Sequence, residues 1–600
     1  MCPVSAWSQS VNSAQPADGA QVFARQCAAC HDGAPTSPST SIGAGRAPTL
    51  EALAARSPQA ILDAMLTGSM RPQGARLSGA ERRAVAAFVT GRTLEGDVRG
   101  AGTGRCTGSE PSGTGASAWT AWSASAGNTR FQSADQAGLS ASQFGALTLK
   151  WAFGFPDASV AWAQPTVMSG RLFVGSQNGT VYALDARSGC IHWTFSAAGG
   201  VRTAIAAADG RLYFGDTAAN AYALDAVSGR QLWVRKVDDH ALARITGSPV
   251  LDAGRLYVPM SSYEEAQGAD PSYPCCTFRG SVSALDASTG RVVWKTYFTD
   301  EPGRRGTSTS GVPLWGASGA AVWSAPTVDP ERRRLYVATG NAYSGPAPAM
   351  SNAVVSLDLD TGRVRWSRQF TPGDIYLSNC RAGNSNCPET NGPDLDFGSP
   401  PMLVTVGGRA LLVIGQKSGW AYAMEAADGR EVWRYRAGQG GVLGGLEWGA
   451  AADEAHAYFA VSDITHPAPG GLHAVHLATG ERAWLAPPRP LLCGSGRGCT
   501  AAQSAPVTVI PGVVLSGAMD GGLRAYATAD GSVLWEFDTN RDFATVNGVP
   551  AKGGSIDGAG PVVAGGMVFV GAGYGAFGGR PGNVLLAFGV PAAEASAGKE

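Results

Sequence analysis

The segment from Arg25 to Gly33 reads RQCAACHDG, with two cysteines two residues apart and a histidine directly after the second. Thiols at this spacing can add to the two vinyl groups of one haem, and the adjacent imidazole then ligates the iron. A zinc or redox pair is the alternative reading, but no second metal-binding pair lies nearby in the sequence. We therefore expect Cys27, Cys30 and His31 to hold one covalently attached haem c.

A sixth iron ligand is expected further along the chain. Residues 61–91 read ILDAMLTGSMRPQGARLSGAERRAVAAFVTG, in which Met70 follows a Gly-Ser turn and Ser78 with Glu81 fits a capping box that opens a helix. This stretch resembles the end of a class I cytochrome c domain, with TGSMRP similar to its axial-methionine loop. Thioether sulfur is a known haem ligand, so we expect Met70 to bind the iron. Met65 is the competitor, but it lies inside an apolar run and is expected to pack in the core.

The other cysteines indicate an oxidising compartment. Eleven cysteines minus the two of the haem motif leave nine, and several stand in pairs within loops. The plausible local pairs are Cys275 with Cys276, Cys380 with Cys387 and Cys493 with Cys499; Cys106 and Cys190 are candidates for a fourth, which leaves Cys2 alone. The first ten residues lack the basic start and apolar segment of a signal peptide. We expect a periplasmic protein whose export signal has been removed or truncated.

Charge and hydropathy exclude two classes of partner. The net charge is −1, which provides no polybasic surface for nucleic acid or for anionic lipid. The sequence has no run of eighteen apolar residues, so we expect no transmembrane segment.

Most of the chain is a repeat with the core ALDxxxGxxxW. Each copy follows an apolar segment such as RLFVGS or RLYVAT, which predicts strand, short turn, strand, glycine turn and a strand that ends in tryptophan. About 40 residues per unit is the period of a four-stranded propeller blade. The seven copies span residues 183–193, 223–233, 284–294, 356–366, 423–433, 474–484 and 525–535.

An eighth blade is expected to be split between the two ends of the repeat region. The C-terminal GMVFVGAGYGAFGGRPGNVLLAF supplies inner strands, and the N-terminal ALTLKWAF supplies the outer strand with Trp151. Joining them closes the ring and removes free sheet edges. We expect each repeat tryptophan to stack between neighbouring blades near the glycine of its own repeat.

The predicted fold is therefore mainly β: an eight-bladed β-propeller preceded by a small all-α cytochrome c domain. The expected boundaries are 15–92 for the cytochrome domain, 93–118 for a flexible Gly/Ser-rich linker and 119–592 for the propeller.

The tryptophan-docking repeat and the increasing size of the third to fifth blades resemble those of the quinoprotein alcohol dehydrogenases. Members of that family hold pyrroloquinoline quinone (PQQ) and a metal ion at the propeller centre. The resemblance implies that Trp323 forms the floor beneath the quinone and that Asn341 binds the metal. A planar tricyclic cofactor needs a flat apolar partner, for which indole is suited. Propellers with the same repeat also serve as binding scaffolds, so the central residues must decide between enzyme and scaffold.

The resemblance also implies a serine for a cofactor carboxylate and a metal-binding glutamate in the preceding blade, which reads LYVPMSSYEEAQG. Ser262 and Glu265 fit the family spacing best, and Ser261 and Glu264 are one residue away. Thr246 matches a family threonine on an inner strand.

The family's general base is an aspartate, and NGPDLDFGSPP offers two candidates, Asp394 and Asp396. If Asp396 is the base, the site resembles the calcium-type enzymes. If Asp394 is the base, Asp396 supplies the additional carboxylate of the lanthanide-using relatives. Hard oxygen ligands suit either ion, and calcium is the favoured one.

Four further positions follow from the same resemblance. Lys417 stands where the family places a cation near the reactive quinone carbonyl. Gln164 replaces the usual glutamate of the first blade. Arg202 or Arg211 is expected to pair with a PQQ carboxylate, because a guanidinium binds carboxylates in a bidentate manner.

The adjacent cysteines Cys275 and Cys276 can close an eight-membered ring that stiffens a turn. Quinoprotein alcohol dehydrogenases carry such a ring against PQQ, but in the previous blade, whereas here it follows the Glu265 segment. With an N-terminal haem motif, the pattern EE…CCTFRGS resembles the cytochrome-containing polyvinyl alcohol dehydrogenases, and the resemblance covers nearly the whole chain. It implies that Cys275 and Cys276 belong to the cofactor site.

The function implied is PQQ-dependent oxidation of a secondary, polymeric alcohol to a ketone. Electrons would pass singly to the haem and then to an external cytochrome c or copper protein. Insertions at 261–280 and 371–396 are expected to shape an open cleft. Two alternatives stay open: small or aromatic alcohols as substrates, and a non-enzymatic periplasmic scaffold, which would not need Trp323, Asn341, Lys417 and the acidic residues.

Overall fold

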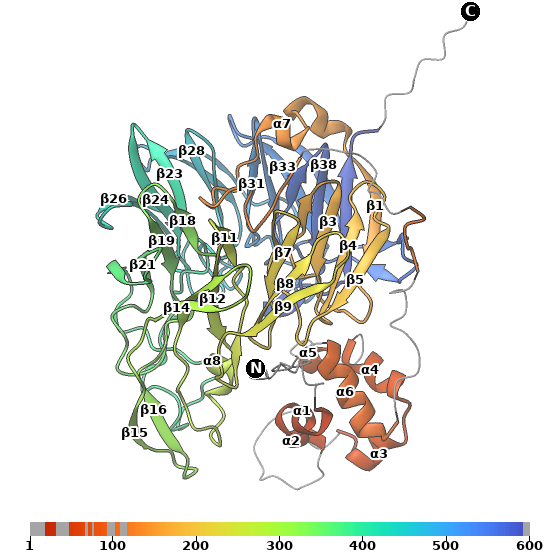
Figure 1. The fold of residues 1–600 in the computed structure, drawn as a ribbon, viewed down its shortest axis with the longest axis vertical. Helices are drawn as coiled ribbons and strands as arrows, with labels where there is room; N and C mark the ends of the chain where they lie inside the picture. Colours follow the sequence, from red (N-terminus) through yellow and green to blue (C-terminus); the bar gives the residue numbers. More distant parts are fainter. Residues whose placement is uncertain are drawn as a thin grey trace, which may run out of the picture.

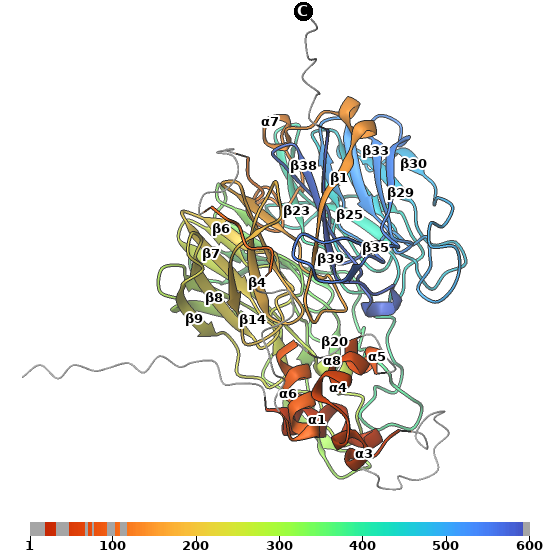
Figure 2. The same ribbon diagram turned by 90° about the vertical axis from the view of Figure 1, so that its right-hand side faces the viewer.

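The computed structural model describes residues 18–31, 47–66, 70–74, 77, 79–92, 103–108 and 117–591. These residues form a small helical unit and a large β-propeller, and Figures 1 and 2 both place the helices at one end of the propeller. Among the helices described, none is long and apolar enough to cross a lipid bilayer.

The helical unit is all-α, as predicted. Asp18 caps the first helix by accepting hydrogen bonds from the backbone N–H groups of Ala20 and Gln21. The capping box proposed at Ser78 involves a residue outside the described part of the chain. The unit consists of α1 (Gly19–Gln26), α2 (Ala28–His31), α3 (Leu50–Ala54), α4 (Pro58–Leu66), α5 (Arg71–Gly74) and α6 (Gly79–Thr90). Its buried core comprises Val22, Phe23, Ile61, Leu62, Met65, Leu77, Val85, Ala86 and Val89.

Each repeat forms one antiparallel blade of the propeller. The alternating apolar residues of the two middle strands are almost fully buried, and the last strand of each blade is partly exposed. The first four blades are β2 (Thr166–Met168), β3 (Arg171–Gly175), β4 (Thr180–Asp185) and β5 (Ile191–Ser196); β6 (Ala206–Ala208), β7 (Arg211–Gly215), β8 (Asn220–Asp225) and β9 (Gln231–Lys236); β11 (Val250–Asp252), β12 (Arg255–Ser262), β13 (Ser281–Asp286) and β14 (Val292–Tyr297), with β10 (Ala243–Arg244) paired to β12; and β18 (Thr327–Asp329), β19 (Arg334–Ala338), β21 (Ala353–Asp358) and β22 (Val364–Gln369).

The remaining blades confirm the ring of eight and its split closure. Strand β1 (Thr148–Gly154) pairs antiparallel with β39 (Val584–Gly589), so the two ends of the repeat region share one sheet. The other strands of that blade are β37 (Val562–Ala564) and β38 (Met567–Ala572). The three blades before it are β23 (Met402–Val406), β24 (Arg409–Gly415), β25 (Trp420–Glu425) and β26 (Glu431–Arg436); β27 (Ala451–Ala452), β28 (His456–Ala460), β29 (Leu472–His476) and β30 (Arg482–Ala486); and β31 (Thr508–Ile510), β32 (Val513–Gly517), β33 (Gly522–Ala527) and β34 (Val533–Asp538).

Short elements complete the chain outside the blades. They are α7 (Ala134–Ala137), α8 (Glu264–Gln267), the 3₁₀ helices η1 (Ala141–Ala146) and η2 (Ala576–Gly578), and the strand pairs β15 (Gly303–Thr307) with β16 (Pro313–Gly316), β17 (Ser318–Gly319) with β20 (Ala342–Ser344), and β35 (Asp542–Phe543) with β36 (Ala551–Lys552).

The repeat tryptophans join each blade to the next one. Trp294, for example, donates from Nε1 to the carbonyl of Leu359 (3.1 Å), and a Cβ on Gly362 would lie 2.5 Å from the Trp294 ring. The expectation that each tryptophan packs on the glycine of its own repeat was therefore wrong: the glycine belongs to the following repeat, because the outer strand of one blade faces the turn of its neighbour. Trp535 closes the ring by donating to the carbonyl of Leu147.

All four cysteine pairs suggested by the sequence are disulfides: Cys106–Cys190, Cys275–Cys276, Cys380–Cys387 and Cys493–Cys499. The Cys106–Cys190 disulfide lies in the segment that was expected to be a flexible linker. Residues 103–108 are fastened to the first blade by this bond and by hydrogen bonds between Cys106 N–H and the Ile191 carbonyl and between Ile191 N–H and the Gly104 carbonyl. This part of the expected flexible linker is thus fixed to the propeller.

The helical unit contacts loops of the first blade directly. The guanidinium of Arg82, which is completely buried, donates to the carbonyl of Asp157 (2.7 Å), and Arg83 forms an ion pair with the Asp157 carboxylate. The N–H of Gly79 donates to the carbonyl of Gln177 (3.2 Å). The first turn of α6 is therefore the part of the unit that docks on the propeller.

Candidate active site

The haem motif lies at the junction of α1 and α2. Neither Cys27 nor Cys30 is in a disulfide, and His31 is buried. The Nδ1 of His31 lies 2.7 Å from the carbonyl oxygen of Pro48. Because a carbonyl only accepts, Nδ1 must donate, and this leaves the lone pair of Nε2 free for iron. The residues present thus fit a haem c.

The two methionines have the environments that the sequence suggested. Met65 is part of the buried core of the helical unit. Met70 is only partly buried and packs against the same core as Cys27. The role of Met70 as the sixth ligand stays a prediction.

The central cavity of the propeller is lined by residues that stand just before the first strand of their blades. It holds about 400 Å³ of open space. Because these residues come from different blades, they can meet only near the axis of the ring. They include Gln164 before β2, Arg202 before β6, Thr246 before β11, Trp323 before β18, Gly398 before β23 and Trp448 before β27.

Trp323 and Asn341 converge on one carboxylate. Trp323 donates from Nε1 to one oxygen of Asp396 (2.9 Å), and the backbone N–H of Asn341 donates to the other oxygen (2.6 Å). A Cβ on Gly340 would lie 2.7 Å from Asp396, so the glycine lets the carboxylate approach this backbone. Gly398 plays the same part for Trp323, whose ring would come within 2.1 Å of an added Cβ.

Three carboxylates gather beside this indole. One oxygen each of Glu265, Asp394 and Asp396 lies within 4.8 Å of the others. Asn341 donates from Nδ2 to the carbonyls of Ala342 and Tyr376, and its buried Oδ1 has no hydrogen-bond partner among the described residues. Several carboxylate oxygens and a free amide oxygen at one point are the ligands that a hard cation requires.

The charges of the site reflect burial and mutual repulsion. Burial, with repulsion from Asp396, raises the pKa of Glu265 to about 7, and burial raises the pKa of Asp396 as well. Burial also raises the pKa of Asp394 well above its usual value, against the attraction of Lys417. The Lys417 ammonium donates to Asp394 (2.6 Å), and although burial alone would lower its pKa, the Asp394 and Asp396 carboxylates hold that pKa above the ordinary value. A bound cation would relieve the repulsion among the carboxylates.

Of the two serines considered for a cofactor carboxylate, Ser261 is the one that contacts a residue of the cavity lining. Side chains alternate along β12, so Ser261 and Ser262 point to opposite faces. Ser261 shares a hydrogen bond with Thr246 (2.7 Å), which lines the cavity. Ser262 instead donates to the carbonyl of Leu242 and accepts from the N–H of Glu264, so it stabilises the start of α8.

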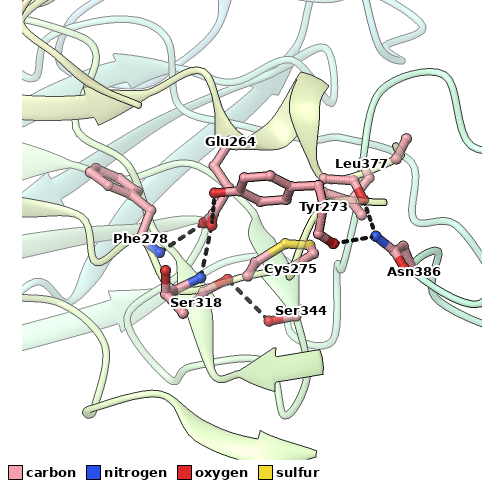
Figure 3. Close-up of a disulfide and its surroundings, with 12 residues drawn as sticks. Glu264, Tyr273, Cys275, Phe278, Ser318, Ser344, Leu377 and Asn386 are labelled. Atoms are coloured by element: carbon pink, nitrogen blue, oxygen red, sulfur yellow. Dashed lines mark hydrogen bonds between the residues drawn. A yellow bond between two sulfur atoms is a disulfide. The ribbon is translucent and has the colours of Figure 1, made fainter. Parts of the chain in front are cut away.

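Of the two glutamates considered for the metal, the structure brings only Glu265 to the acid cluster. Glu264 is fully buried, and its carboxylate accepts from Tyr273 OH (2.9 Å), Thr277 N–H (2.8 Å) and Phe278 N–H (2.7 Å), as Figure 3 shows. A carboxylate with three donors holds its own loop in place. Glu264 is therefore a structural residue in this geometry.

The two arginines considered for a cofactor carboxylate are also separated by the structure. Arg202 lines the cavity, with its guanidinium carbon 4.5 Å from the centre of the Trp448 ring. Arg211 begins β7 with an exposed side chain and is not among the described residues around the cavity. A flat indole and a guanidinium in one cavity suit a planar, carboxylated cofactor such as PQQ.

Gln164 lines the cavity but has a supporting role. Its Oε1 accepts from Arg130 (2.5 Å), and its Nε2 donates to the carbonyl of Trp122 (2.9 Å). Arg130 is completely buried and also donates to the carbonyls of Val507 and Pro561. This arginine links distant blades, and nothing in the repeat pattern indicated it.

The ring formed by Cys275 and Cys276 exists, and it belongs to an apolar cluster against which Trp323 of the cavity lining also packs. Both cysteines are buried in the same apolar cluster as Leu377 and Phe278, and Figure 3 shows Cys275 among these side chains. Asn386 holds this loop by donating to the carbonyl of Tyr273 (2.8 Å). The two insertions expected to shape a cleft thus pack on each other, and neither cysteine is among the described residues that line the central space.

Several residues that support the site escaped the sequence analysis. Asp374 accepts from the N–H groups of Asp394 and Leu395 and so fixes the acidic segment, and Ser378 donates to Glu265 (2.8 Å). Trp448 stands before the first strand of its blade, as Trp323 does. That shared position is the one signal in the sequence that could have identified it.

Comparison with known proteins separates the two kinds of propeller. The model described as outer membrane protein assembly factor BamB matches residues 111–322 and 468–588. The model described as glucose/ethanol/alcohol dehydrogenase, beta-propeller domain, matches residues 269–439, which contain Trp323, Asn341, Asp394, Asp396 and Lys417. The N-terminal residues 14–89 match the model described as cytochrome C oxidase, cbb3-type, subunit III.

Solved structures and curated relatives extend the comparison to the whole chain. A quinohemoprotein alcohol dehydrogenase from Pseudomonas putida has the same fold, with a TM-score of 0.60 at 19% identity over 82% of this chain and 83% of that one. A polyvinylalcohol dehydrogenase from a Pseudomonas species is 39% identical over 96% of this chain and 93% of its own length. Another, from a Sphingopyxis species, is 38% identical over the same shares.

A haem-binding helical unit joined to a propeller with an acid cluster beside a central indole defines a PQQ-dependent quinohaemoprotein alcohol dehydrogenase. Such an enzyme oxidises alcohols and passes the electrons to its own haem c. Within this class, the chain belongs to the polyvinyl alcohol dehydrogenase family. Calcium is the ion typical of the quinoprotein dehydrogenases, and the oxygen ligands present fit it.

Proposed function

We propose that this enzyme oxidises secondary hydroxyl groups along a polymer chain to ketones. It acts in the periplasm and delivers its electrons, through the haem, to an external cytochrome c or copper protein. The observation that carries the catalytic part is the meeting of Glu265, Asp394 and Asp396 beside the indole of Trp323. The near full-length similarity to two polyvinylalcohol dehydrogenases supports the polymeric substrate. The disulfides and the haem motif support an oxidising, exported location.

The two aspartates have different roles in this proposal. Both oxygens of Asp396 already accept hydrogen bonds, from Trp323 and from Asn341, so Asp396 is oriented as a cation ligand together with Glu265. Asp394 is held by Lys417 through one oxygen, and its other oxygen is buried with no partner in the described chain. That free oxygen is the one that can take the hydroxyl proton, which makes Asp394 the general base.

Lys417 and Trp323 complete the catalytic arrangement. When bound, PQQ supplies the carbonyl that accepts hydride, and the cation polarises that carbonyl as a Lewis acid. Lys417 keeps Asp394 in position and stabilises negative charge that develops on the alcohol oxygen. Trp323 provides a flat, fixed face against which the cofactor ring is oriented. One turnover converts a carbinol into a ketone and releases two protons and two electrons.

The two alternative functions would require different features of the chain. Small or aromatic alcohols would need no subsite beyond the central cavity. A scaffold propeller would need no buried acid cluster, and such a cluster is costly to retain without a bound cation.

The test uses the complete haem-containing chain supplied with PQQ and calcium. We expect alcohol-dependent reduction of the haem with poly(vinyl alcohol) and with propan-2-ol, seen in the visible haem bands. Repeating the assay with a lanthanide ion tests whether Asp396 acts as the additional carboxylate ligand. Turnover of primary or aromatic alcohols with no turnover of secondary ones would refute the proposed substrate class. A fully oxidised haem with every alcohol, despite bound quinone, would refute the enzymatic function.

A further inference from the structure

A second cavity lies next to the central one and shares the indole of Trp448 as a wall. It is partly open to solvent, and it has no part in the catalytic arrangement derived above. Its lining includes Leu443, Glu447, Ile464, Ser504, Asp557 and Phe577. Trp448 is the side chain common to the linings of the two cavities.

The shared wall is held rigidly. Trp448 donates from Nε1 to Asp557 (2.6 Å) and packs edge-on against Trp323, with ring centres 5.1 Å apart. The guanidinium of Arg202 covers its ring at 4.5 Å. The Trp448 indole, held on several sides, therefore forms a fixed wall between the central cavity and the second cavity.

The lining of the second cavity combines a carboxyl oxygen that lacks a hydrogen-bond partner in the described chain with apolar side chains. Glu447 is only 7% exposed, and its Oε1 has no hydrogen-bond partner within the described part of the chain. A buried carboxyl oxygen without a partner is unfavourable unless a ligand or water supplies one. Leu443, Ile464 and Phe577 provide apolar contacts beside it. Hydroxyl groups and methylene groups would therefore both find partners there.

Phe577 marks the outer side of this cavity. The residue is 51% exposed, the largest exposure of any phenylalanine described, and its ring contacts Trp448 and Tyr574 with ring centres 6.2 and 6.3 Å away. Its φ of +49° is unfavourable for a residue with a Cβ, so the fold holds the ring in this place at an energetic cost. In Figure 2 the blue 3₁₀ helix that carries it lies at the end of the propeller nearest the helical unit.

We infer that the second cavity binds the part of a polyhydroxylated carbon chain that flanks the carbinol being oxidised. Glu447 contacts a neighbouring hydroxyl group, and Leu443, Ile464 and Phe577 contact the methylene groups between hydroxyls. The inference rests on the proposed function, because it assigns this space to the same substrate. It makes Glu447 and Phe577 residues that determine specificity for long polyols over single alcohols.

The test compares a polymer with a short alcohol in the same holoenzyme. KM is measured with poly(vinyl alcohol) and with propan-2-ol, using an artificial electron acceptor. Phe577→Ala and Glu447→Leu are expected to raise KM for the polymer by about tenfold or more, and to leave KM for propan-2-ol unchanged. Glu447→Gln keeps a hydrogen-bonding group and is expected to restore most of the polymer affinity. Leu485→Ala, on an exposed strand of the same blade as Trp448, is the matched control and changes neither value.

A binding measurement without turnover completes the test. Calorimetric titration of poly(vinyl alcohol) into the haem-containing chain prepared without PQQ should give a binding signal that Phe577→Ala weakens. If the wild-type enzyme oxidises propan-2-ol and both variants have the wild-type KM for the polymer, the subsite is wrong and the proposed function stands. Wild-type enzyme that oxidises no alcohol would overturn the proposed function and the subsite together. Equal loss with both substrates would also overturn the subsite, because it would indicate damage to the reaction centre.

Discussion

At the residue scale, two aspartates that are separated by a single residue have different surroundings. Asp396 receives two donors, from Trp323 and Asn341, and Asp394 is left with one free oxygen beside Lys417. Asp394 also has a positive φ of +59°, which is uncommon for a residue with a Cβ. The difference between general base and cation ligand arises from the hydrogen-bond donors around each carboxylate.

Matched substitutions of these two residues test the division of roles. Asp394→Asn should lower kcat by about 10²–10⁴ while the protein keeps its bound metal and quinone, because only the proton acceptor is lost. Asp396→Asn should lower the metal and quinone content itself, measured by elemental analysis and by extraction of the cofactor. If Asp396→Asn abolished turnover at full occupancy and Asp394→Asn lost the metal, the two roles would be exchanged.

A pH prediction follows from Glu447. Burial, together with repulsion from Asp557, raises its pKa from 4.5 to about 8. Between these values the folded chain keeps a proton that the unfolded chain releases, so stability falls as pH rises through this window, by at most about 1.4 kcal/mol per pH unit. Glu447→Gln removes this proton uptake. We expect the unfolding temperature of the variant, relative to wild type, to rise steadily across the window.

Asp286→Asn is the control for this experiment. Hydrogen bonds from Ser288 and Thr289 lower the Asp286 pKa to about 2, so this residue is ionised in both states throughout the window. Its variant should differ from wild type by a constant amount. A constant difference for Glu447→Gln as well would contradict the shifted pKa.

The sequence could single out a site residue only where one residue of a suitable type stands at the expected place in the repeat. Trp323, Asn341 and Lys417 have side chains that the family requires at one place in the repeat. The choice between Glu264 and Glu265, or between Ser261 and Ser262, depends on which side chain a turn directs to the axis. Three backbone and hydroxyl donors capture Glu264, and these donors come from a loop whose path the sequence does not reveal.

At the element scale, the blades are held together by contacts between a tryptophan and a glycine turn. Gly362 combines a φ of +68° with a position 2.5 Å from the Trp294 ring for any added Cβ. Gly210 has nearly the same φ, +71°, but nothing within 4 Å of its Cβ position. Comparing substitutions at these two glycines therefore distinguishes the cost of the backbone conformation from the cost of disturbing the contact between blades.

Gly362→Ala should therefore destabilise the propeller more than Gly210→Ala does. The shared backbone term is about 1 kcal/mol, and forcing the Trp294 ring away adds about 1–3 kcal/mol. Thermal unfolding of the two variants measures the difference. Equal losses of stability would show that the indole contact contributes nothing beyond the turn conformation.

The linker shows where sequence composition misleads. Its Gly- and Ser-rich composition predicted a free tether, and the pairing of Cys106 with Cys190 was only one option for two distant residues. The disulfide fastens the chain to β5 and shortens the connection that starts after α6. Composition describes an isolated segment, and it cannot report a covalent bond to residues far along the chain.

Opening this disulfide should slow the delivery of electrons to the haem. With Cys106→Ser and Cys190→Ser together, the stretch from Arg92 to a fixed point on the propeller about doubles in length, so the effective concentration of the haem unit falls about threefold. Stopped-flow haem reduction should slow accordingly and depend more on salt, because the Arg83–Asp157 pair then contributes more to docking. The paired substitution Cys493→Ser with Cys499→Ser opens a loop elsewhere and serves as the control. The same slowing in both pairs would exclude a tether effect.

At the scale of the whole molecule, the ring of eight blades explains why the chain needs its two ends together. Repeat period and repeat tryptophans predicted the number of blades and the split blade, because both follow from a pattern that recurs along the chain. The ring directs loops from most of its blades to the axis, which is how residues from 122 to 558 come to line a single cavity. The helical unit docks on the first blade, so electrons released at the axis have an acceptor within the same chain.

We expect alcohol oxidation at the axis to reduce the haem of the same molecule. The haem spectrum of the full chain, recorded after anaerobic mixing with a secondary alcohol, with and without PQQ and calcium, tests this expectation. Haem reduction should occur at a rate independent of protein concentration, and only when both PQQ and the cation are bound. The haem of Asp394→Asn, at the same haem and quinone content, should stay oxidised. A haem that remains oxidised in the fully loaded wild type, or one that is reduced equally well without quinone, would contradict this expectation.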